Sequence, residues 1–421
     1  MLTLIALMSS IPAAVGTLRV SDSARAAIRS AIADQDEQVG LDNLLRADLS
    51  LMWRTTELTV GYGPRLSVAR WFDGSQPWDA NFMHEVDAGF YLRESRYTFG
   101  LSQSFSYGTQ SFGQAFAIPG GITASPPGTE PGTSPSALAA AATAATPVSP
   151  LPRGTGDLVP LRSVQYLGYS SRGAFTYLFS PRWESNFDVS YNVSGGRDSD
   201  RAVLPRISTV DIGSAVEYAI TRHHGFGGVL HGERGWSDQG DFWLTELAAS
   251  WAWRFSEYSL FSLRAGISYR NTEDEGSPER TSRVSPVAAA GLTHTIRLEG
   301  SRALLGVVVT YDPGVDVISA TLQNRLTLLA SASWATEDTS VTLALTGSQE
   351  FGGDDGRFGG VSLTLDQRLV GWLGMQVGGQ VAKQDSGLED TQLDEVQRGF
   401  YTGTIWTVFA GLTATLDPQK F

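Results

Sequence analysis

Residues 258–270 read YSLFSLRAGISYR, a segment in which apolar and polar side chains alternate. One parity carries Phe261, Leu263, Ala265, Ile267 and Tyr269, and the other carries Ser262, Arg264, Gly266, Ser268 and Arg270. Alternation with a period of two residues indicates a β-strand whose two faces meet different surroundings. The segment therefore predicts a strand with one apolar face and one polar face that bears charges.

The same alternation recurs from residue 44 to residue 416, and it divides the chain into about seventeen strand segments. The first two are residues 44–53 and 55–69, and the last is residues 399–416. Residues 317–336 form the longest segment, with Asn324 as the one polar interruption of its apolar face. Bacterial single-chain barrels have even strand numbers, so the count of about seventeen segments is compatible with a barrel of about sixteen or eighteen strands.

The position of the charges separates two all-β architectures. The polar faces hold Arg, Asp and Gln in mid-strand, while the apolar faces are bounded by aromatic residues. Lipid outside and water inside a closed barrel explain both features, because the wall then has an apolar outer and a polar inner face. A soluble β-sandwich also alternates, but its core of about 10 Å needs no strands of this length. We therefore expect a transmembrane antiparallel up-and-down β-barrel.

Connections between the segments alternate between short turns and longer polar loops. We expect the short set to face the periplasm and the longer set to face the exterior. Trp53, Trp183, Trp253, Trp334 and Trp372 lie beside short turns, and Trp71, Trp78, Trp236 and Trp243 lie beside long connections. Trp at both boundaries is typical of aromatic belts at membrane interfaces, although burial in a core is an alternative for these residues.

Composition excludes several classes of protein. The chain has 421 residues with 31 Lys+Arg against 44 Asp+Glu, a net charge of -13, which disfavours nucleic acid as a partner. Beyond residue 16, no apolar run reaches the roughly 18 residues that a spanning helix needs. There is no Cys, which excludes disulfides and thiolate metal sites.

Residues 1–16, MLTLIALMSSIPAAVG, have the apolar stretch and small-residue end of a signal peptide, with cleavage expected after Gly16. A basic start is missing, because Arg19 is the first positive residue, and a buried N-terminal strand or helix is the alternative. Residues 17–43 contain a Ser21-Asp22-Ser23 cap before Ala24, Ala27 and Ile28. They predict a periplasmic leader or a plug helix, so the barrel is expected over residues 44–421.

Residues 109–161 form an insertion rich in Pro, Gly, Ala, Ser and Thr. This composition predicts a long external loop. An inward fold that narrows the pore is the alternative, but the insertion lacks large apolar or charged anchors for it.

Motifs for chemistry are absent from the sequence. There is no Gly-x-Ser-x-Gly elbow, no phosphate-binding Gly loop and no His-Glu-x-x-His pattern. A lipase-type barrel would need a Ser and a His on the lipid-facing wall, and His294 falls on the apolar face. We expect neither an enzyme, a cofactor nor a metal site.

Taken together, the signal, the alternating strands, the turn and loop asymmetry and the C-terminal Phe421 resemble Gram-negative outer-membrane porin-like barrels, at the level of a class. The last strand, with Phe409, Gly411 and Leu412, is similar to the insertion signal of that class, although residues 417–420 separate it from Phe421. The resemblance implies a place in the bacterial outer membrane. It implies contact with membrane lipid and lipopolysaccharide, and with the barrel-assembly machinery.

The polar face supplies the candidate functional residues. The side chains expected to line the pore are Asp87, Asp188, Asp211, Glu217, Glu246, Arg264, Arg297, Arg325, Asp366 and Arg368. Opposed acidic and basic groups favour the passage of hydrated polar solutes. We therefore expect a polar channel or export conduit for hydrophilic solutes or polysaccharide. The alternative is a structural or surface-interaction barrel whose charges neutralise one another in a closed lumen.

Overall fold

The computed structural model describes most of the chain. The described residues are 15–29, 38–71, 78–111, 163–198, 206–237, 240–274, 280–316, 321–351, 357–385, 402–416 and 419–420. The expected signal, except for its last two residues, lies outside them. So does the expected loop, except for residues 109–111, which end a strand.

Strands make up the whole fold within these residues. They are β1 (Val15–Arg29), β2 (Gln38–Met52), β3 (Thr56–Trp71), β4 (Asp79–Arg93), β5 (Tyr97–Ser111), β6 (Ser163–Ser180), β7 (Trp183–Gly196), β8 (Ile207–Ala219), β9 (His224–Ser237), β10 (Gly240–Ser256), β11 (Ser259–Asp274), β12 (Arg280–Leu298), β13 (Ser301–Asp316), β14 (Thr321–Ala335), β15 (Thr339–Phe351), β16 (Arg357–Val370), β17 (Leu373–Asp385), β18 (Thr402–Thr415) and the two-residue β19 (Gln419–Lys420). The described residues include no helix that is long and apolar enough to cross a membrane.

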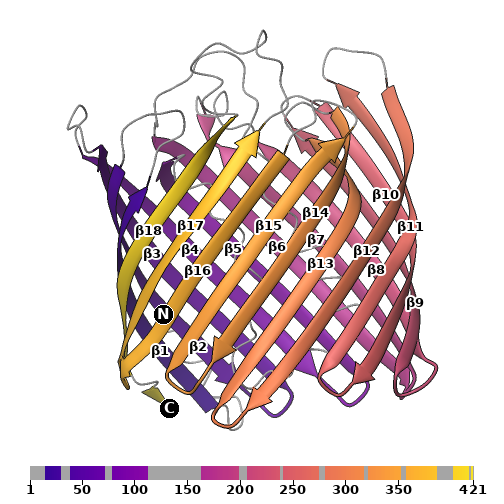
Figure 1. Cartoon of the computed structure of the whole chain (residues 1–421), viewed down its shortest axis with the longest axis horizontal. Coiled ribbons are helices and arrows are strands. Elements are labelled where there is room, and N and C mark those ends of the chain that lie inside the picture. Colours follow the sequence, from indigo (N-terminus) through magenta and orange to yellow (C-terminus); the bar gives the residue numbers. More distant parts are fainter. Residues whose placement is uncertain are drawn as a thin grey trace, which may run out of the picture.

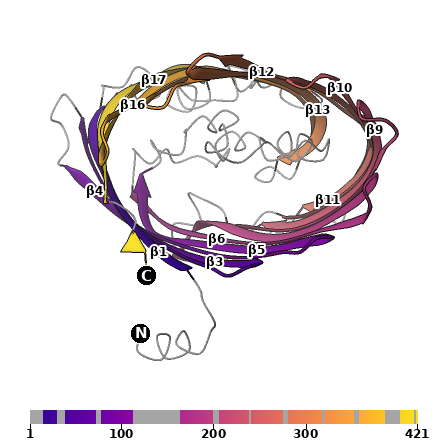
Figure 2. The ribbon, with the colours of Figure 1, turned by 90° about the horizontal axis from the view of Figure 1, so that it is seen from below.

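The strands form one closed antiparallel barrel (Figures 1 and 2). Each strand from β1 to β18 pairs with its neighbour in sequence, and β1 pairs with β18 from Ser21↔Thr415 to Arg29↔Thr407. The short β19 pairs with the start of β1 through Thr17↔Lys420. Closure matters because a lipid environment leaves an unpaired strand edge without hydrogen-bond partners.

Strand boundaries follow the sequence alternation closely, and the main correction concerns the N-terminal segment. Residues 17–43 contain most of β1 and the start of β2, so the expected leader or plug helix is wrong for the described part of this range. The backbone of β1 is hydrogen-bonded on both sides, to β2 and to β18, and this pairing outweighs the weak helical pattern. The barrel therefore has eighteen strands, with β1 as the strand missed from the sequence.

The tight turns that the structure describes lie at one edge of the barrel. Tight turns join β2 to β3, β4 to β5 and the later strand pairs at the lower edge in Figure 1. Trp53 N donates a hydrogen bond to Thr56 O over 2.7 Å across the first of them. Gly300, at φ 71°, supplies the left-handed residue in the turn between β12 and β13.

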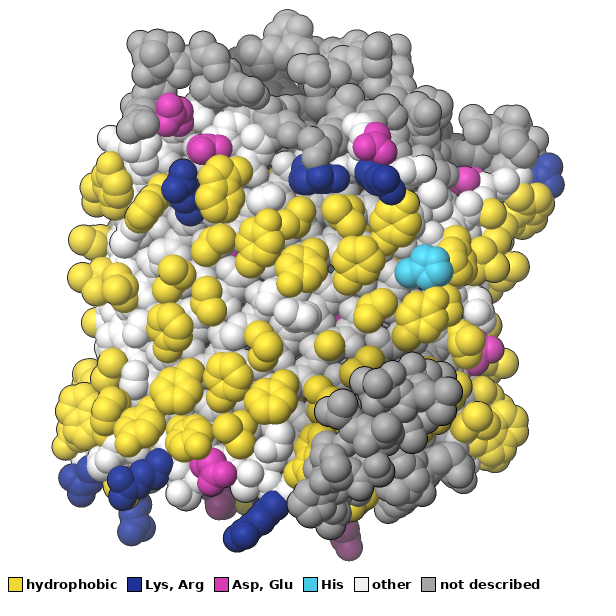
Figure 3. All heavy atoms as spheres, turned by 180° about the vertical axis from the view of Figure 1, so that it is seen from behind, with side chains coloured by type: hydrophobic (Ala, Val, Ile, Leu, Met, Phe, Trp, Pro, Cys, Tyr) yellow, Lys and Arg dark blue, Asp and Glu magenta, His cyan; other side chains and the backbone are white. Residues whose placement is uncertain are grey.

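The outer wall is apolar over most of its height. Figure 3 shows a belt of hydrophobic side chains with charged groups mainly above and below it. Trp183, Trp253, Trp334 and Trp372 lie exposed beside the short turns, and Trp78 and Trp243 lie exposed beside the opposite rim. This distribution is that of a lipid-facing surface with aromatic belts.

Candidate functional site: the charged inner wall

The inner wall consists of the side chains whose parity is opposite to that of the exposed apolar residues. On β15, Leu343 and Leu345 are about two-fifths exposed, whereas Ala344 and Thr346 on the other parity are buried. The same contrast holds on β7, where Phe187 and Val189 are exposed on either side of Asp188. Alternation along each strand therefore places the charged residues on the lumen side.

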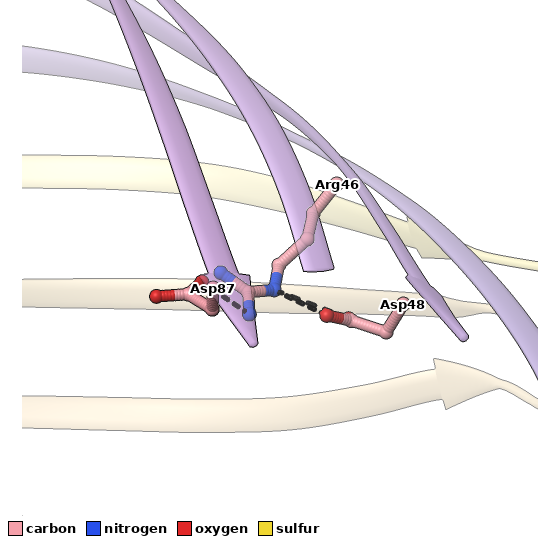
Figure 4. A network of polar contacts seen from close by, with 3 residues as sticks. All are labelled: Arg46, Asp48 and Asp87. Atoms are coloured by element: carbon pink, nitrogen blue, oxygen red, sulfur yellow. Dashed lines mark hydrogen bonds and ion pairs between the residues drawn. The ribbon is translucent and has the colours of Figure 1, made fainter. Parts of the chain in front are cut away.

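A cluster of charges on β2 and β4 lies on an accessible part of the inner wall. Arg46 Nε lies 2.9 Å from Asp48 Oδ1, and Arg46 Nη2 lies 2.9 Å from Asp87 Oδ2 (Figure 4). The exposed fractions of these side chains are 33%, 39% and 42%. Water therefore reaches all three charged groups, and we refer to them as the accessible cluster.

Gly61 on β3 makes the accessible cluster possible. It pairs with both Asp48 on β2 and Asp87 on β4, so it lies between the two carboxylates. A Cβ atom at this position would lie 2.7 Å from Asp48 Oδ1 and 2.9 Å from Arg46 Nη2. A glycine here gives the guanidinium of Arg46 room to reach across β3 to β4.

A second group of charges continues the accessible cluster toward the β1–β18 seam. Arg25 Nη2 donates a hydrogen bond to Asp42 Oδ2 over 3.2 Å, and Arg65 Nη2 lies 3.9 Å from the same oxygen. The guanidinium of Arg25 also lies over the ring of Phe409 on β18, 4.9 Å from its centre. Basic and acidic groups thus alternate over the inner face of β1 to β4.

The opposite side of the lumen carries a tightly packed set of charges on β8 to β11. Glu246 on β10 forms an ion pair with Arg264 on β11, and both residues are buried. On β8, Asp211 accepts a hydrogen bond from Ser190 Oγ over 2.8 Å, and its other oxygen lies 3.8 Å from His231 Nε2. Arg270 on β11 is only 1% exposed. We call Glu246, Arg264 and Arg270 the buried cluster.

The structure distributes the ten expected pore-lining residues over several environments. Asp87 belongs to the accessible cluster, while Glu246 and Arg264 belong to the buried cluster, and Glu217 is buried as well. Among the remaining inward carboxylates, Asp188 lies beside Gly213, Asp211 accepts a hydrogen bond from Ser190, and Asp366 accepts one from Gln376 over 2.9 Å.

The basic candidates also lie in different environments. Arg325 on β14 pairs with Asp312 in the ladder. Arg297 lies over the ring of Tyr258 at 5.3 Å, and Arg368 lies 3.9 Å from Asp338. These last two are exposed beside short turns, at the rim and not in mid-lumen.

Sequence reasoning missed several charged residues of the inner wall. Arg25 and Asp42 were missed because residues 17–43 were assigned to a leader or plug helix. Arg46 lies near the start of the first predicted strand, residues 44–53, and was not included among the candidates. Their signal was present, since Asp42 and Arg46 alternate with Leu41 and Leu45. Continuing the period of two toward the N-terminus would have found them.

A closed antiparallel wall, apolar outside and charged inside, is the architecture of transmembrane barrels of the bacterial outer membrane. The chain has the fold of an outer-membrane β-barrel. No protein-family description matches it, and no curated protein matches it by sequence.

Solved structures with a similar fold include Pseudomonas aeruginosa OccK7 (OpdD), at 11% identity over 97% of this chain and 100% of that chain, with a TM-score of 0.46. A BenF-like porin from Pseudomonas fluorescens Pf-5 has 9% identity over 96% and 99% of the two chains and a TM-score of 0.43. Because these identities and TM-scores are low, the similarities assign neither a solute nor a residue role to this barrel.

The outer wall contains one Ser–His pair of the kind that a lipase-type barrel would require. Ser259 Oγ lies 2.7 Å from His294 Nδ1, and the two residues are directly paired between β11 and β12. Ser259 is only 4% exposed, however, and its hydroxyl also binds Ser256 Oγ over 2.9 Å. These hydrogen bonds stabilise the β10–β11 turn. They do not suit a catalytic pair, because a nucleophile must be open to its substrate.

In the part of the chain that the structure describes, no group of three His, Asp or Glu side chains is arranged to hold a metal ion. The charged residues of the inner wall instead pair with one another. What the arrangement offers chemically is a polar, charged surface along the inside of a membrane-spanning wall.

Proposed function

We propose that the barrel is a passive channel for small hydrophilic solutes across the outer membrane. The observation that carries this proposal is the accessible cluster, Arg46, Asp48 and Asp87, whose ion-paired side chains keep a third or more of their surface exposed within the lumen. A lumen filled only by structural ion pairs would bury such groups, as it does for Glu246 and Arg264.

The charges of the accessible cluster favour hydrated solutes over apolar ones. A guanidinium lies between two carboxylates, so both donors and acceptors for a polar solute face the same part of the lumen. Such groups replace part of the hydration shell of a passing solute, which an apolar wall cannot do. A polysaccharide chain needs the same hydrogen-bonding groups but a longer continuous path.

Solute flux into proteoliposomes tests the proposal. Purified protein is reconstituted into vesicles, and the uptake of a small sugar, a small amino acid and a dextran is compared with uptake into empty vesicles. We expect the small solutes to enter and the dextran to be retained outside. Entry of the dextran would favour a polysaccharide conduit, and exclusion of all three would favour a structural or surface-interaction barrel.

A further inference from the structure

Tyr91 on β4 is an exposed aromatic residue of the inner wall. It shares the parity of Asp87, which belongs to the accessible cluster, whereas its neighbour Phe90 shares the parity of the outward residues. Tyr91 is 47% exposed. It lies between the accessible cluster and the short turn that follows β4. A large aromatic ring is therefore open to the lumen near the short-turn edge of the barrel.

Two glycines allow the ring of Tyr91 to lie flat along the wall. Gly100 on β5 is paired directly with Tyr91, and Gly89 precedes Tyr91 by two residues on β4. A Cβ atom at Gly100 would lie 3.3 Å from Cδ1 of the ring, and a Cβ atom at Gly89 would lie 3.0 Å from Cε2. Opposite edges of the ring thus lie over the two glycines. One face of the ring rests on the wall, and the other face is open to the lumen.

Hydrogen-bonding side chains border this ring. Glu57 on β3 is paired directly with Tyr91, and its carboxylate accepts a hydrogen bond from Ser50 Oγ over 3.1 Å. Thr59 on β3 and Ser102 on β5 lie on the same face, one on either side of β4. The site thus combines a flat apolar surface with a carboxylate and several hydroxyl groups at its edge.

This combination fits the ring form of a sugar. A pyranose has C–H groups on its faces, which pack on the negative face of an aromatic ring, and hydroxyl groups at its rim, which bind carboxylates and other hydroxyls. The carboxylate of Glu57 disfavours an anion beside the ring. Arg93 lies two residues beyond Tyr91 and is exposed, so an aromatic anion is the alternative solute that an experiment has to separate.

We propose that Tyr91 is a platform on which the ring of a neutral sugar stacks, while Glu57, Thr59 and Ser102 bind its hydroxyl groups. The inference rests on the proposed channel function and names a solute class for it. An acyclic polyol offers the same hydroxyl groups but no rigid apolar face, so the platform should distinguish the two.

The reduction of ion current by added solute tests the platform in reconstituted channels. Its concentration dependence is recorded for glucose, for the acyclic polyol sorbitol, and for benzoate at constant ionic strength. Tyr91→Ala removes the ring, and Tyr91→Phe retains it. Phe90→Ala is the matched control, because it removes the adjacent ring on the outer wall. Heat-modifiable migration on gels confirms that each variant folds as a barrel.

We expect glucose to reduce the wild-type current to a saturating level, and sorbitol to cause only the linear decrease that higher viscosity produces. Tyr91→Ala should weaken the apparent affinity for glucose by about two- to tenfold, the range of aromatic stacking energies. Tyr91→Phe should retain most of that affinity, and Phe90→Ala should match wild type. If Tyr91→Ala fails to fold, Tyr91→Leu takes its place, since leucine keeps apolar bulk without an aromatic face.

Three results would contradict these expectations in different ways. Equal effects of glucose and sorbitol, or a glucose affinity that is unchanged without the aromatic ring, would overturn the platform and leave the channel function standing. Saturation by benzoate and not by glucose would show that the ring binds aromatic anions, and would overturn the sugar as the solute. Folded barrels that never conduct would contradict both proposals.

Discussion

Two neighbouring residues of a strand in this barrel face different surroundings, one lipid and the other the lumen. Leu343 lies in the middle of β15 on the outer wall and is 38% exposed, whereas Thr342 lies on the inner wall. The first meets lipid and the second meets the lumen, because side chains alternate across a strand. The same rule assigns Arg46 and Asp48 to the lumen while Leu45 and Leu49 face outward.

Replacing Leu343 by Arg should destabilise the barrel by about 2 to 4 kcal/mol, the cost of a basic side chain near the bilayer midplane. Thr342→Arg is the matched control, and we expect it to be far better tolerated because the lumen offers water and counter-charges. The urea midpoint of unfolding in lipid vesicles measures both. Equal damage at the two positions would indicate a dry core on both sides of the wall.

Removing the guanidinium of Arg46 should change ion selectivity and leave the fold intact. In Arg46→Ala, the carboxylates of Asp48 and Asp87 lose their counter-charge while remaining exposed to water. We therefore expect a shift toward cation selectivity, measured as the reversal potential under a salt gradient. Arg222→Ala, in the β8–β9 turn, serves as a control. An equal shift of the reversal potential in both variants would contradict a specific effect of the accessible cluster on ion selectivity.

At the scale of elements, the sequence was sufficient for seventeen of the strands and insufficient for β1. In strands such as β11 every second residue from Phe261 to Tyr269 is apolar, because that face of the strand meets lipid. In β1 the same parity holds Ala24, Ala26 and the polar Asp22, so the period is weak. Its strand state depends on pairing with β18, which lies almost 400 residues away in sequence and leaves no local signal.

The inner wall shows a similar division. Which residues are expected to face the lumen follows from parity, and the ten candidates were chosen in this way. Which of them are accessible depends on contacts between strands, such as the space that Gly61 leaves between Asp48 and Arg46. Such a contact has no signature in a single strand.

A proline in β1 tests whether this element belongs to the wall. Ala24→Pro removes a backbone N–H from the interior of a ladder between β2 and β18, so the yield of folded barrel should fall sharply. Ala24→Val adds bulk on the lipid-facing side and should fold normally. A proline variant that folds as well as the valine variant would show that β1 is dispensable for closure.

The N-terminal signal remains a prediction, and the fold is compatible with it. Cleavage after Gly16 would leave Thr17 at the N-terminus, where it pairs with Ser50 of β2 and Lys420 of β19. Mass spectrometry of protein from the membrane fraction should find Thr17 or a near neighbour as the first residue. An intact Met1 in that fraction would contradict the signal.

At the scale of the whole molecule, closure, an apolar outer wall and a charged inner wall lead to one conclusion. Closure gives the backbone groups of every strand hydrogen-bond partners within the wall, as a lipid environment requires. The outer belt is apolar, as is the hydrocarbon core of a membrane. The inner charges include an accessible set on β2 and β4 and a buried set on β10 and β11. We therefore propose a continuous aqueous path along the accessible set.

Planar-bilayer recording of the purified wild-type protein measures that path directly. We expect stepwise insertion events, each followed by a steady ohmic current, because an aqueous path lined by charged groups conducts small ions. Protein that inserts as a folded barrel, shown by heat-modifiable migration after recovery from the bilayer, and yet passes no current would contradict the account.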